Sequence, residues 1–229
     1  MWLLHSSIGR KLMMSITGIA LVLFLLFHLS MNITALFSAD VYNMICAFLG
    51  ANWYAIAATV ILGALACLHI AFSIIITIQN NKARGKDQYA VKKRPKGVSW
   101  ASQNMFILGS VVGGFLALHI YQFWRRMMFA ELLGHHEVMI GGSMVSPQDG
   151  YAFIRYYFSQ LWVVIAYLTW YVALWFHLTH GFWSAFQSMG LSNHLWLNRL
   201  KTISNIVATA ILSGFALVTI MFYVKHLIK

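Results

Sequence analysis

Residues 153–187 read FIRYYFSQLWVVIAYLTWYVALWFHLTHGFWSAFQ, a stretch whose only Lys, Arg, Asp or Glu is Arg155. An α-helix needs about 20 residues to cross a lipid bilayer, and this run is longer. It therefore predicts a membrane-spanning helix that is tilted, or one that begins as a separate helix at the membrane surface. The preceding residues 146–149, Ser-Pro-Gln-Asp, predict that the helix begins there with the serine as its N-cap. His177 and His180 lie one turn apart on roughly the same face.

The whole chain has the composition of a membrane protein. Its 229 residues are 60% hydrophobic and only 9% charged, whereas soluble domains carry about a quarter charged residues. Five apolar runs are long enough to cross the hydrocarbon layer, and none contains an acidic side chain. These runs are residues 12–37, 53–79, 101–124, 153–187 and 203–224. We therefore expect an all-α integral membrane protein, one domain over residues 1–229, built as a bundle of five transmembrane helices.

Basic residues gather on the side of the membrane that holds the N-terminus. Eleven of the sixteen Lys and Arg lie there, seven of them in residues 80–100. By the positive-inside rule this side is cytoplasmic, and an odd number of spans puts the C-terminus outside. The net charge of +11 indicates topology and contact with lipid. No basic cluster interleaved with aromatic residues occurs outside the spans, so we expect no nucleic-acid partner.

Five histidines lie inside the predicted spans, where an ionisable side chain is a hypothesis of function by default. Depth follows from the helical rise of 1.5 Å per residue, counted from the cytoplasmic end of each span. On this scale His28 and His119 lie roughly 25 and 27 Å deep. His69 lies roughly 15 Å deep and His177 roughly 18 Å, with His180 one turn nearer the cytoplasm. The first and third spans thus present a histidine at one level, and the second and fourth at another.

Two histidines from different helices at equal depth are what bis-histidine ligation of haem b requires, with one imidazole on each face of the porphyrin. The depths allow His28 with His119, and His69 with either His177 or His180. His177 and His180 cannot share one iron, because they lie on one helix face. No Cys-x-x-Cys-His occurs, so two haems would be held without covalent bonds. The alternatives are histidines bonded to neighbouring helices, or a different cofactor.

These residues resemble a known family, the di-haem cytochrome b anchors of succinate:menaquinone oxidoreductases and quinol:fumarate reductases that have one five-helix anchor subunit. The resemblance covers essentially the whole chain and rests on KLMMSITG before FLLFHL, LACLH, GGFLALH and HLTHGFWSAFQSMG. In the family, the fourth-span ligand stands four residues before a glycine followed by a bulky apolar and an aromatic residue. His177 and Gly181 match that pattern, and Gly181 would leave space for the porphyrin. His180 then becomes a neighbour of the ligand.

The resemblance implies axial ligands, partners and a reaction. His28 and His119 would bind the iron of a distal haem, and His69 and His177 that of a proximal haem. A flavoprotein subunit would interconvert succinate and fumarate, and an iron–sulfur subunit would relay electrons to this chain. The chain would pass them through two haems b to or from menaquinone in a bacterial inner membrane, with its C-terminus periplasmic. Both soluble subunits would dock on the cytoplasmic face, where residues 80–100 contribute; plain positive-inside charge explains these residues equally well.

Weaker candidates for the site follow from the same resemblance. Ser15 and Thr17 resemble positions near the propionates of the cytoplasmic haem, although hydroxyls inside helices commonly bond to their own backbone. Arg155 is a candidate partner of the distal propionates, or it snorkels to the membrane surface. His180 would lie near a propionate of the proximal haem. Asp40 is the outer-side candidate for a quinone site, and an ordinary loop aspartate is an equal alternative.

Two other classes of function are open. Trp175 stands where some family members have a glutamate proposed to carry protons, so we expect no proton path of that kind. The di-haem anchor of a hydrogenase or formate dehydrogenase is also quinone-reactive, but such anchors dock their catalytic subunits outside, whereas the basic face here points inward. A transporter or channel generally places acidic residues near the middle of the membrane, and these spans contain none.

Overall fold

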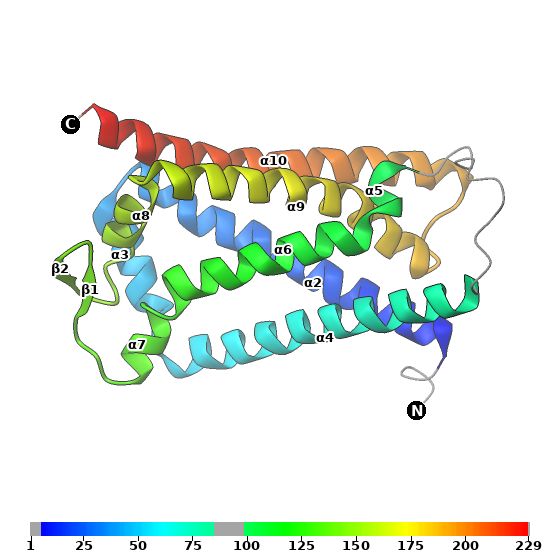
Figure 1. Ribbon diagram of the computed structural model, residues 1–229, viewed down its shortest axis with the longest axis horizontal. Helices are drawn as coiled ribbons and strands as arrows, with labels where there is room; N and C mark the ends of the chain where they lie inside the picture. Colours follow the sequence, from blue (N-terminus) through cyan, green and yellow to red (C-terminus); the bar gives the residue numbers. More distant parts are fainter. Residues whose placement is uncertain (1–5, 85–98, 229) are drawn as a thin grey trace.

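Five long helices run side by side along one axis in this computed structural model, which describes residues 6–84 and 99–228 (Figure 1). They are α2 (Ser7–Ile33), α4 (Trp53–Arg84), α6 (Met105–His119), α9 (Leu161–Ser188) and α10 (His194–Leu227). Each is long and apolar enough to cross a membrane, α6 together with the π-helical turn η2 (Ile120–Trp124). The chain is therefore an all-α, multi-pass membrane protein with five candidate spans, as the composition predicts.

Successive long helices run in opposite directions, so the bundle has two ends (Figure 1). We call the end where α2 begins the N-terminal end, and the end where α10 finishes the C-terminal end. Helix α9 packs on α10, α2 and α6, whereas α4 packs chiefly on α2. Val163 and Ile211 are fully buried where α9 meets α10. A Cβ added at Gly214 would lie 2.8 Å from Leu29 Cδ2, so glycine lets α10 approach α2 closely.

The predicted run 153–187 forms two helices. Helix α8 (Gly150–Phe158) ends before Ser159 and Gln160, and α9 begins at Leu161. Of the two alternatives, a single tilted helix is wrong, and a separate short helix followed by a span is confirmed. The break places the mostly buried α8 at the C-terminal end, across the start of the span (Figure 1).

The predicted start of this segment is wrong by three residues. Asp149, not Ser146, is the N-cap, because its side chain accepts a hydrogen bond from Ala152 N at 3.1 Å. Asn43 Nδ2 donates to the same carboxylate oxygen at 2.7 Å and so holds it in place. Ser146 Oγ instead accepts from Gln148 N at 3.3 Å, within the preceding turn. The tertiary bond to Asn43 therefore favours the later of two suitable caps.

The predicted run 101–124 is also interrupted. A short helix, α5 (Trp100–Gln103), ends at Asn104, and α6 follows it directly. After His119 the helix widens into η2, where Arg125 N bonds to Ile120 O at 2.9 Å. Such π-helical turns are rare and occur frequently at functional sites.

Shorter elements that the sequence did not predict close the C-terminal end. They are the 3₁₀ turn η1 (Thr34–Leu36), α3 (Ala39–Phe48), α7 (Met128–Leu132), and the hairpin of β1 (Val138–Ile140) and β2 (Ser143–Val145). Gly141 and Gly142 adopt positive φ in the two-residue hairpin turn, as this turn requires. Glu131 accepts from Ala51 N at 3.0 Å and from Gln148 Nε2 at 2.6 Å, which ties three segments together. Burial raises the pKa of Cys46 in α3 to about 11, so its thiol stays protonated at neutral pH.

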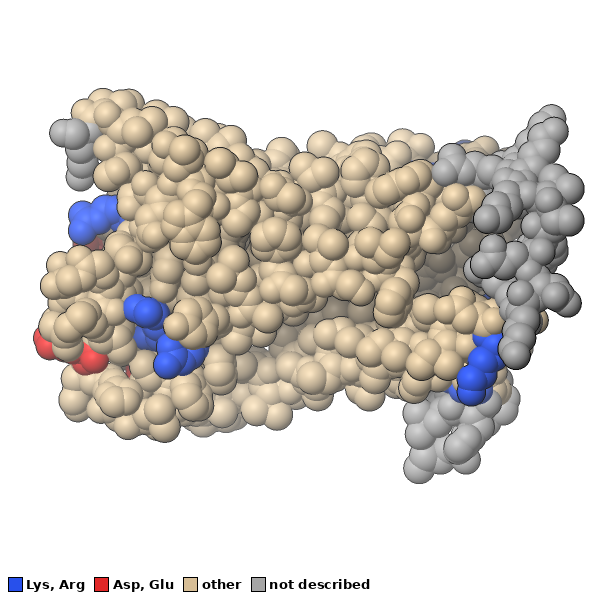
Figure 2. Space-filling model, in the orientation of Figure 1, with Lys and Arg blue, Asp and Glu red and all other residues tan. Residues whose placement is uncertain are grey.

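Charged side chains lie at the two ends of the bundle. Figure 2 shows Lys and Arg at both ends, Asp and Glu at one, and a band without charge between them. All four acids that the structure describes, Asp40, Glu131, Glu137 and Asp149, belong to the segments of the C-terminal end. Residues 85–98, which hold much of the predicted basic loop, lie outside the described residues.

Candidate functional site: two pairs of facing histidines

Four histidines from four helices form two facing pairs. His28 of α2 and His119 at the end of α6 have ring centroids 5.8 Å apart, with an interplanar angle of 85°. His69 of α4 and His177 of α9 have ring centroids 6.3 Å apart, with an angle of 69°. The depths counted in the sequence allow both pairs, but they allow His180 in place of His177 equally well. That the paired histidines bind haem stays a prediction.

The two separations fit a metal ion held between the rings. An imidazole nitrogen lies about 2.0 Å from a bound metal, which puts the ring centroid roughly 3.1 Å from it. Two axial imidazoles then have centroids about 6.3 Å apart. The observed 5.8 and 6.3 Å agree with this value. Each site has only two protein ligands, so the remaining coordination positions of the metal would be filled by a planar ligand such as a porphyrin.

Glycines lie against both rings of the pair nearer the N-terminal end. A Cβ added at Gly18 of α2 would lie 3.2 Å from His69 Cε1, and one added at Gly109 of α6 would lie 3.5 Å from His177 Cε1. Thr17 Oγ1, next to Gly18, lies 3.1 Å from His69 Nδ1. Helix α2 therefore holds the His69 ring from its side, with a hydroxyl and a bare backbone. Neither Gly18 nor Gly109 was predicted from the sequence.

A buried polar chain extends from the other pair. His119 Nδ1 lies 3.3 Å from the hydroxyl of Tyr167 on α9, and that hydroxyl donates to Gln122 Oε1 at 2.8 Å. Tyr167 is 2% exposed and Gln122 3%. Gln122 lies in η2, one turn beyond His119. Neither Tyr167 nor Gln122 was predicted from the sequence, although a buried glutamine in an apolar span is a visible signal.

The His28 ring is held by its own helix. Phe24, one turn earlier, stacks on it with centroids 5.4 Å apart at an interplanar angle of 18°. Asn32, one turn later, donates from Nδ2 to the carbonyl oxygen of His28 at 2.7 Å, and the same nitrogen lies 3.5 Å from each ring nitrogen. The side chains one turn before and one turn after His28 on α2 thus both contact its imidazole.

Buried nitrogen atoms without a hydrogen-bond partner lie beside both pairs. Among the described residues these include Trp170 Nε1 and the Nδ1 atoms of His177 and His180. The Trp170 ring lies 5.8 Å from that of His119, centroid to centroid. An indole N–H can only donate, and leaving it unpaired costs about 1–3 kcal/mol. A haem carboxylate beside His119 would provide the acceptor, so this residue fits the predicted cofactor.

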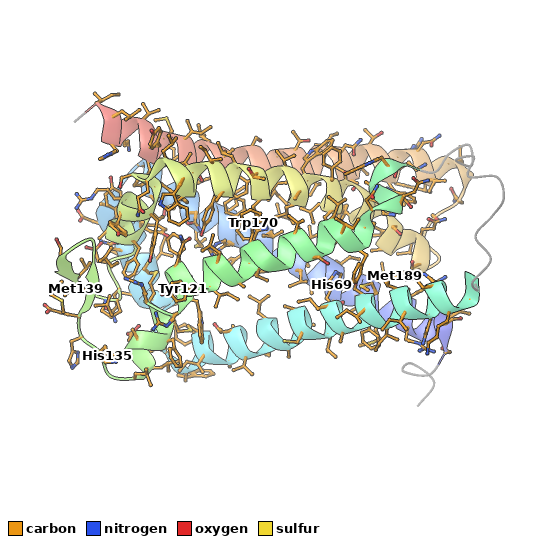
Figure 3. The ribbon with its side chains drawn as sticks, in the orientation of Figure 1. His69, Tyr121, His135, Met139, Trp170 and Met189 are labelled. Carbon is orange, nitrogen blue, oxygen red and sulfur yellow. The ribbon has the colours of Figure 1, made fainter. Side chains whose placement is uncertain are left out.

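The pairs lie at different levels along the bundle. His69 lies nearer the N-terminal end, and Trp170, which accompanies His119, lies toward the middle (Figure 3). Among the described residues, the His180 ring packs on Trp183, with centroids 5.1 Å apart, and is paired with no second histidine across the bundle. Lys201 Nζ lies 5.0 Å from the centroid of the Trp183 ring. The Trp183 ring thus contacts both His180 and the positively charged Lys201, and a propionate near His180 would find the charge of this lysine.

The remaining predicted residues lie in different surroundings. Ser15 is buried, and its hydroxyl donates to Lys11 O at 2.9 Å. This bond to the backbone of its own helix is the alternative given above to a contact with a propionate. Among the described residues, a Cβ added at Gly181 would lie 3.8 Å from Met105 Cε, an ordinary packing distance, so that Gly181 makes space for a porphyrin stays a prediction. Asp40 in the first turn of α3 and Arg155 on α8 are both exposed at the C-terminal end.

The described residues contain no group of three or more His, Cys, Asp or Glu side chains placed to hold a metal ion. A metal site made only of protein ligands is therefore not found in this part of the chain. No protein-family model, no curated protein and no solved structure matches the sequence or the fold. What the chain does is inferred from its own residues.

Proposed function

We propose that the chain is a di-haem cytochrome b, the membrane subunit that carries electrons between the iron–sulfur subunit of a succinate dehydrogenase or fumarate reductase and menaquinone. The observation that carries the proposal is the facing of two histidine pairs from four helices, at centroid separations of 5.8 and 6.3 Å. When bound, haem b supplies a one-electron iron couple, and two such groups at different levels let an electron cross the membrane.

In this proposal, His28 and His119 are the axial ligands of the distal haem iron, and His69 and His177 are those of the proximal one. Support for His177 over His180 comes from their surroundings, because the His177 ring faces His69 while the His180 ring packs on Trp183. The unpaired Trp170 Nε1 is also suited to a porphyrin with carboxylates.

The side chains around the pairs orient the imidazoles and exclude water. Aromatic rings pack on both histidines of the distal pair, including Phe24 on His28 and Trp170 beside His119. Trp175 donates from Nε1 to Thr209 Oγ1 at 2.9 Å and so joins α9 to α10. An indole N–H can only donate a hydrogen bond and has no acid–base group to relay a proton, so we propose electron transfer here without a proton path at this position.

The distribution of charge supports a cytoplasmic N-terminal end in a bacterial inner membrane. The described residues of that end carry basic side chains, among them Arg10, Lys11 and Lys201, whereas the described acids lie at the other end. A basic face suits docking of an iron–sulfur subunit and, through it, a flavoprotein subunit. The chain would then be the quinone-reactive part of the enzyme, and the succinate or fumarate site would belong to the flavoprotein.

Purification of the chain from its native membrane tests the proposal. We expect a reduced-minus-oxidised visible spectrum with b-type haem bands, and co-purification of a flavoprotein and an iron–sulfur protein. Recovery of a nickel or molybdenum subunit instead would assign the chain to a hydrogenase or formate dehydrogenase. A purified, folded chain without haem bands would contradict both assignments.

A further inference from the structure

Each histidine pair contains one ring whose Nδ1 faces a hydroxyl group. In one pair it is His69, whose Nδ1 lies 3.1 Å from Thr17 Oγ1. In the other it is His119, whose Nδ1 lies 3.3 Å from Tyr167 Oη. The two hydroxyls come from different helices and different residue types, yet they meet the same imidazole nitrogen in the same way.

The hydroxyl hydrogen of Thr17 is already committed to the backbone. Thr17 Oγ1 donates to Met13 O at 2.8 Å and lies 3.1 Å from Met14 O. A hydroxyl has one hydrogen, and a carbonyl oxygen can only accept. Toward His69, the Thr17 oxygen can therefore act only as an acceptor. The hydrogen between Oγ1 and Nδ1 must then belong to the imidazole.

The hydroxyl of Tyr167 also donates its one hydrogen elsewhere, in this case to a side chain. Tyr167 Oη donates to Gln122 Oε1 at 2.8 Å, and both residues are buried. The Tyr167 oxygen is left as an acceptor for His119 Nδ1–H. Gln122 reaches this position from the π-helical turn η2 that directly follows His119. The π-helical turn thus places Gln122 where it accepts the hydrogen bond of Tyr167, next to His119.

We infer that Thr17 and Tyr167 are positioning residues that hold His69 and His119 in the tautomer protonated at Nδ1. That tautomer leaves the Nε2 lone pair of each ring free to bind a metal. The inference rests on the proposed function in so far as the metal is haem iron. His177 Nδ1 has no hydrogen-bond partner among the described residues, so in that pair a hydroxyl fixes the tautomer of His69 only.

The same contact tunes each haem separately. Donation of Nδ1–H to an oxygen makes an imidazole a more basic ligand. A more basic axial ligand stabilises the oxidised iron more than the reduced iron and so lowers the midpoint potential. Among the four paired histidines, Thr17 bonds only to His69, and Tyr167 only to His119. Each hydroxyl therefore acts on one haem and leaves the other as its internal reference.

The test is a spectroelectrochemical titration of the full, haem-loaded chain carrying Thr17→Val or Tyr167→Phe. We expect Thr17→Val to raise the midpoint potential of the haem that is lost in His177→Ala, and Tyr167→Phe to raise that of the other haem. Thr17→Ser keeps the acceptor and should restore the wild-type potential. Tyr171→Phe is the matched control, because that hydroxyl bonds to Thr219 Oγ1 at 3.0 Å and to neither pair.

Several results would overturn the inference. One is that the haems of loaded Thr17→Val and Tyr167→Phe keep the wild-type midpoint potentials. Another is a change in midpoint potential or haem content that is as large in Thr17→Ser as in Thr17→Val. The same holds if the change in Tyr171→Phe equals that in Tyr167→Phe, because altered packing alone would then explain the effect. Loss of haem only in the variants that lack the acceptor supports the inference.

A second measurement does not depend on haem. Nitrogen chemical shifts of labelled histidines in the full chain stripped of cofactor report the tautomer of each ring directly. We expect His69 and His119 to be protonated at Nδ1, and protonation at Nε2 in either ring would contradict the inference. If the wild-type chain never binds haem, the proposed function is contradicted, but the nitrogen chemical shifts still test the tautomers of His69 and His119.

Discussion

Replacement of Gly18 by alanine should weaken the proximal haem while leaving the distal one in place. The added Cβ would lie 3.2 Å from Cε1 of the His69 ring, closer than the 3.5–4.0 Å at which carbon atoms pack without strain. The ring has little freedom to withdraw, because its Nδ1 is also held at 3.1 Å by Thr17 Oγ1. The strain must therefore displace the imidazole from the position that it holds opposite His177.

The expected size follows from the cost of overpacking, about 1–3 kcal/mol. If that cost falls on the haem-bound state, affinity for the proximal haem falls roughly 5- to 150-fold, at about 1.4 kcal/mol for each factor of ten. Gly109→Ala is the matched control, since its Cβ would meet the other ring of the pair, His177 Cε1, at an ordinary 3.5 Å. Both changes add the same methyl group to a helix, so their effects on helix propensity cancel.

The assay is titration of the haem-free variants with haemin, followed at the Soret band and read separately for the two sites. We expect a weakened proximal site in Gly18→Ala, and near wild-type binding at both sites in Gly109→Ala. Equal weakening in the two variants, or loss of the distal rather than the proximal haem in Gly18→Ala, would refute the reasoning.

Three further predictions concern single side chains. His177→Ala should abolish the proximal haem while His180→Ala retains it, as read from haem content; loss confined to His180→Ala would show that the ligand is misassigned. Gln122→Leu removes the acceptor of the Tyr167 hydroxyl, so in the haem-free chain this hydroxyl can turn, donate to His119 Nδ1 and favour the tautomer protonated at Nε2; nitrogen chemical shifts of the labelled histidine measure this change, and a ring still protonated at Nδ1 would contradict it. Asp149→Ala removes the cap of α8 and should lower the unfolding free energy by about 1 kcal/mol, with haem content unchanged; chemical denaturation measures the loss, and a wild-type midpoint would contradict the role of the cap.

The sequence alone predicted the five long helices and the level of each histidine. Both depend on quantities that hold for any α-helix, the length needed to cross a bilayer and the rise for each residue. The same rise paired His28 with His119, and the structure places the centroids of these two rings 5.8 Å apart. Rise alone left His177 and His180 undecided, because one turn of depth is within the uncertainty of where a span begins.

Residues around the pairs could not be found in this way, because spacing does not set how a helix is rotated toward its neighbours. Gly18 faces His69, and Tyr167 faces His119, across helix contacts far apart in sequence. The hairpin and α3 at the C-terminal end are short and mixed in polarity, so no period marks them. Asp149 prevailed over Ser146 as a cap through its bond to Asn43, about a hundred residues earlier.

The decisive measurement is the number of haem b groups that each purified chain binds. Extraction as the pyridine haemochrome, against protein measured by amino-acid analysis, gives this number. The two facing pairs, His28 with His119 and His69 with His177, predict two haems b per chain in the wild type, and one when either pair loses a histidine. A folded wild-type chain that binds one haem or none would contradict the account.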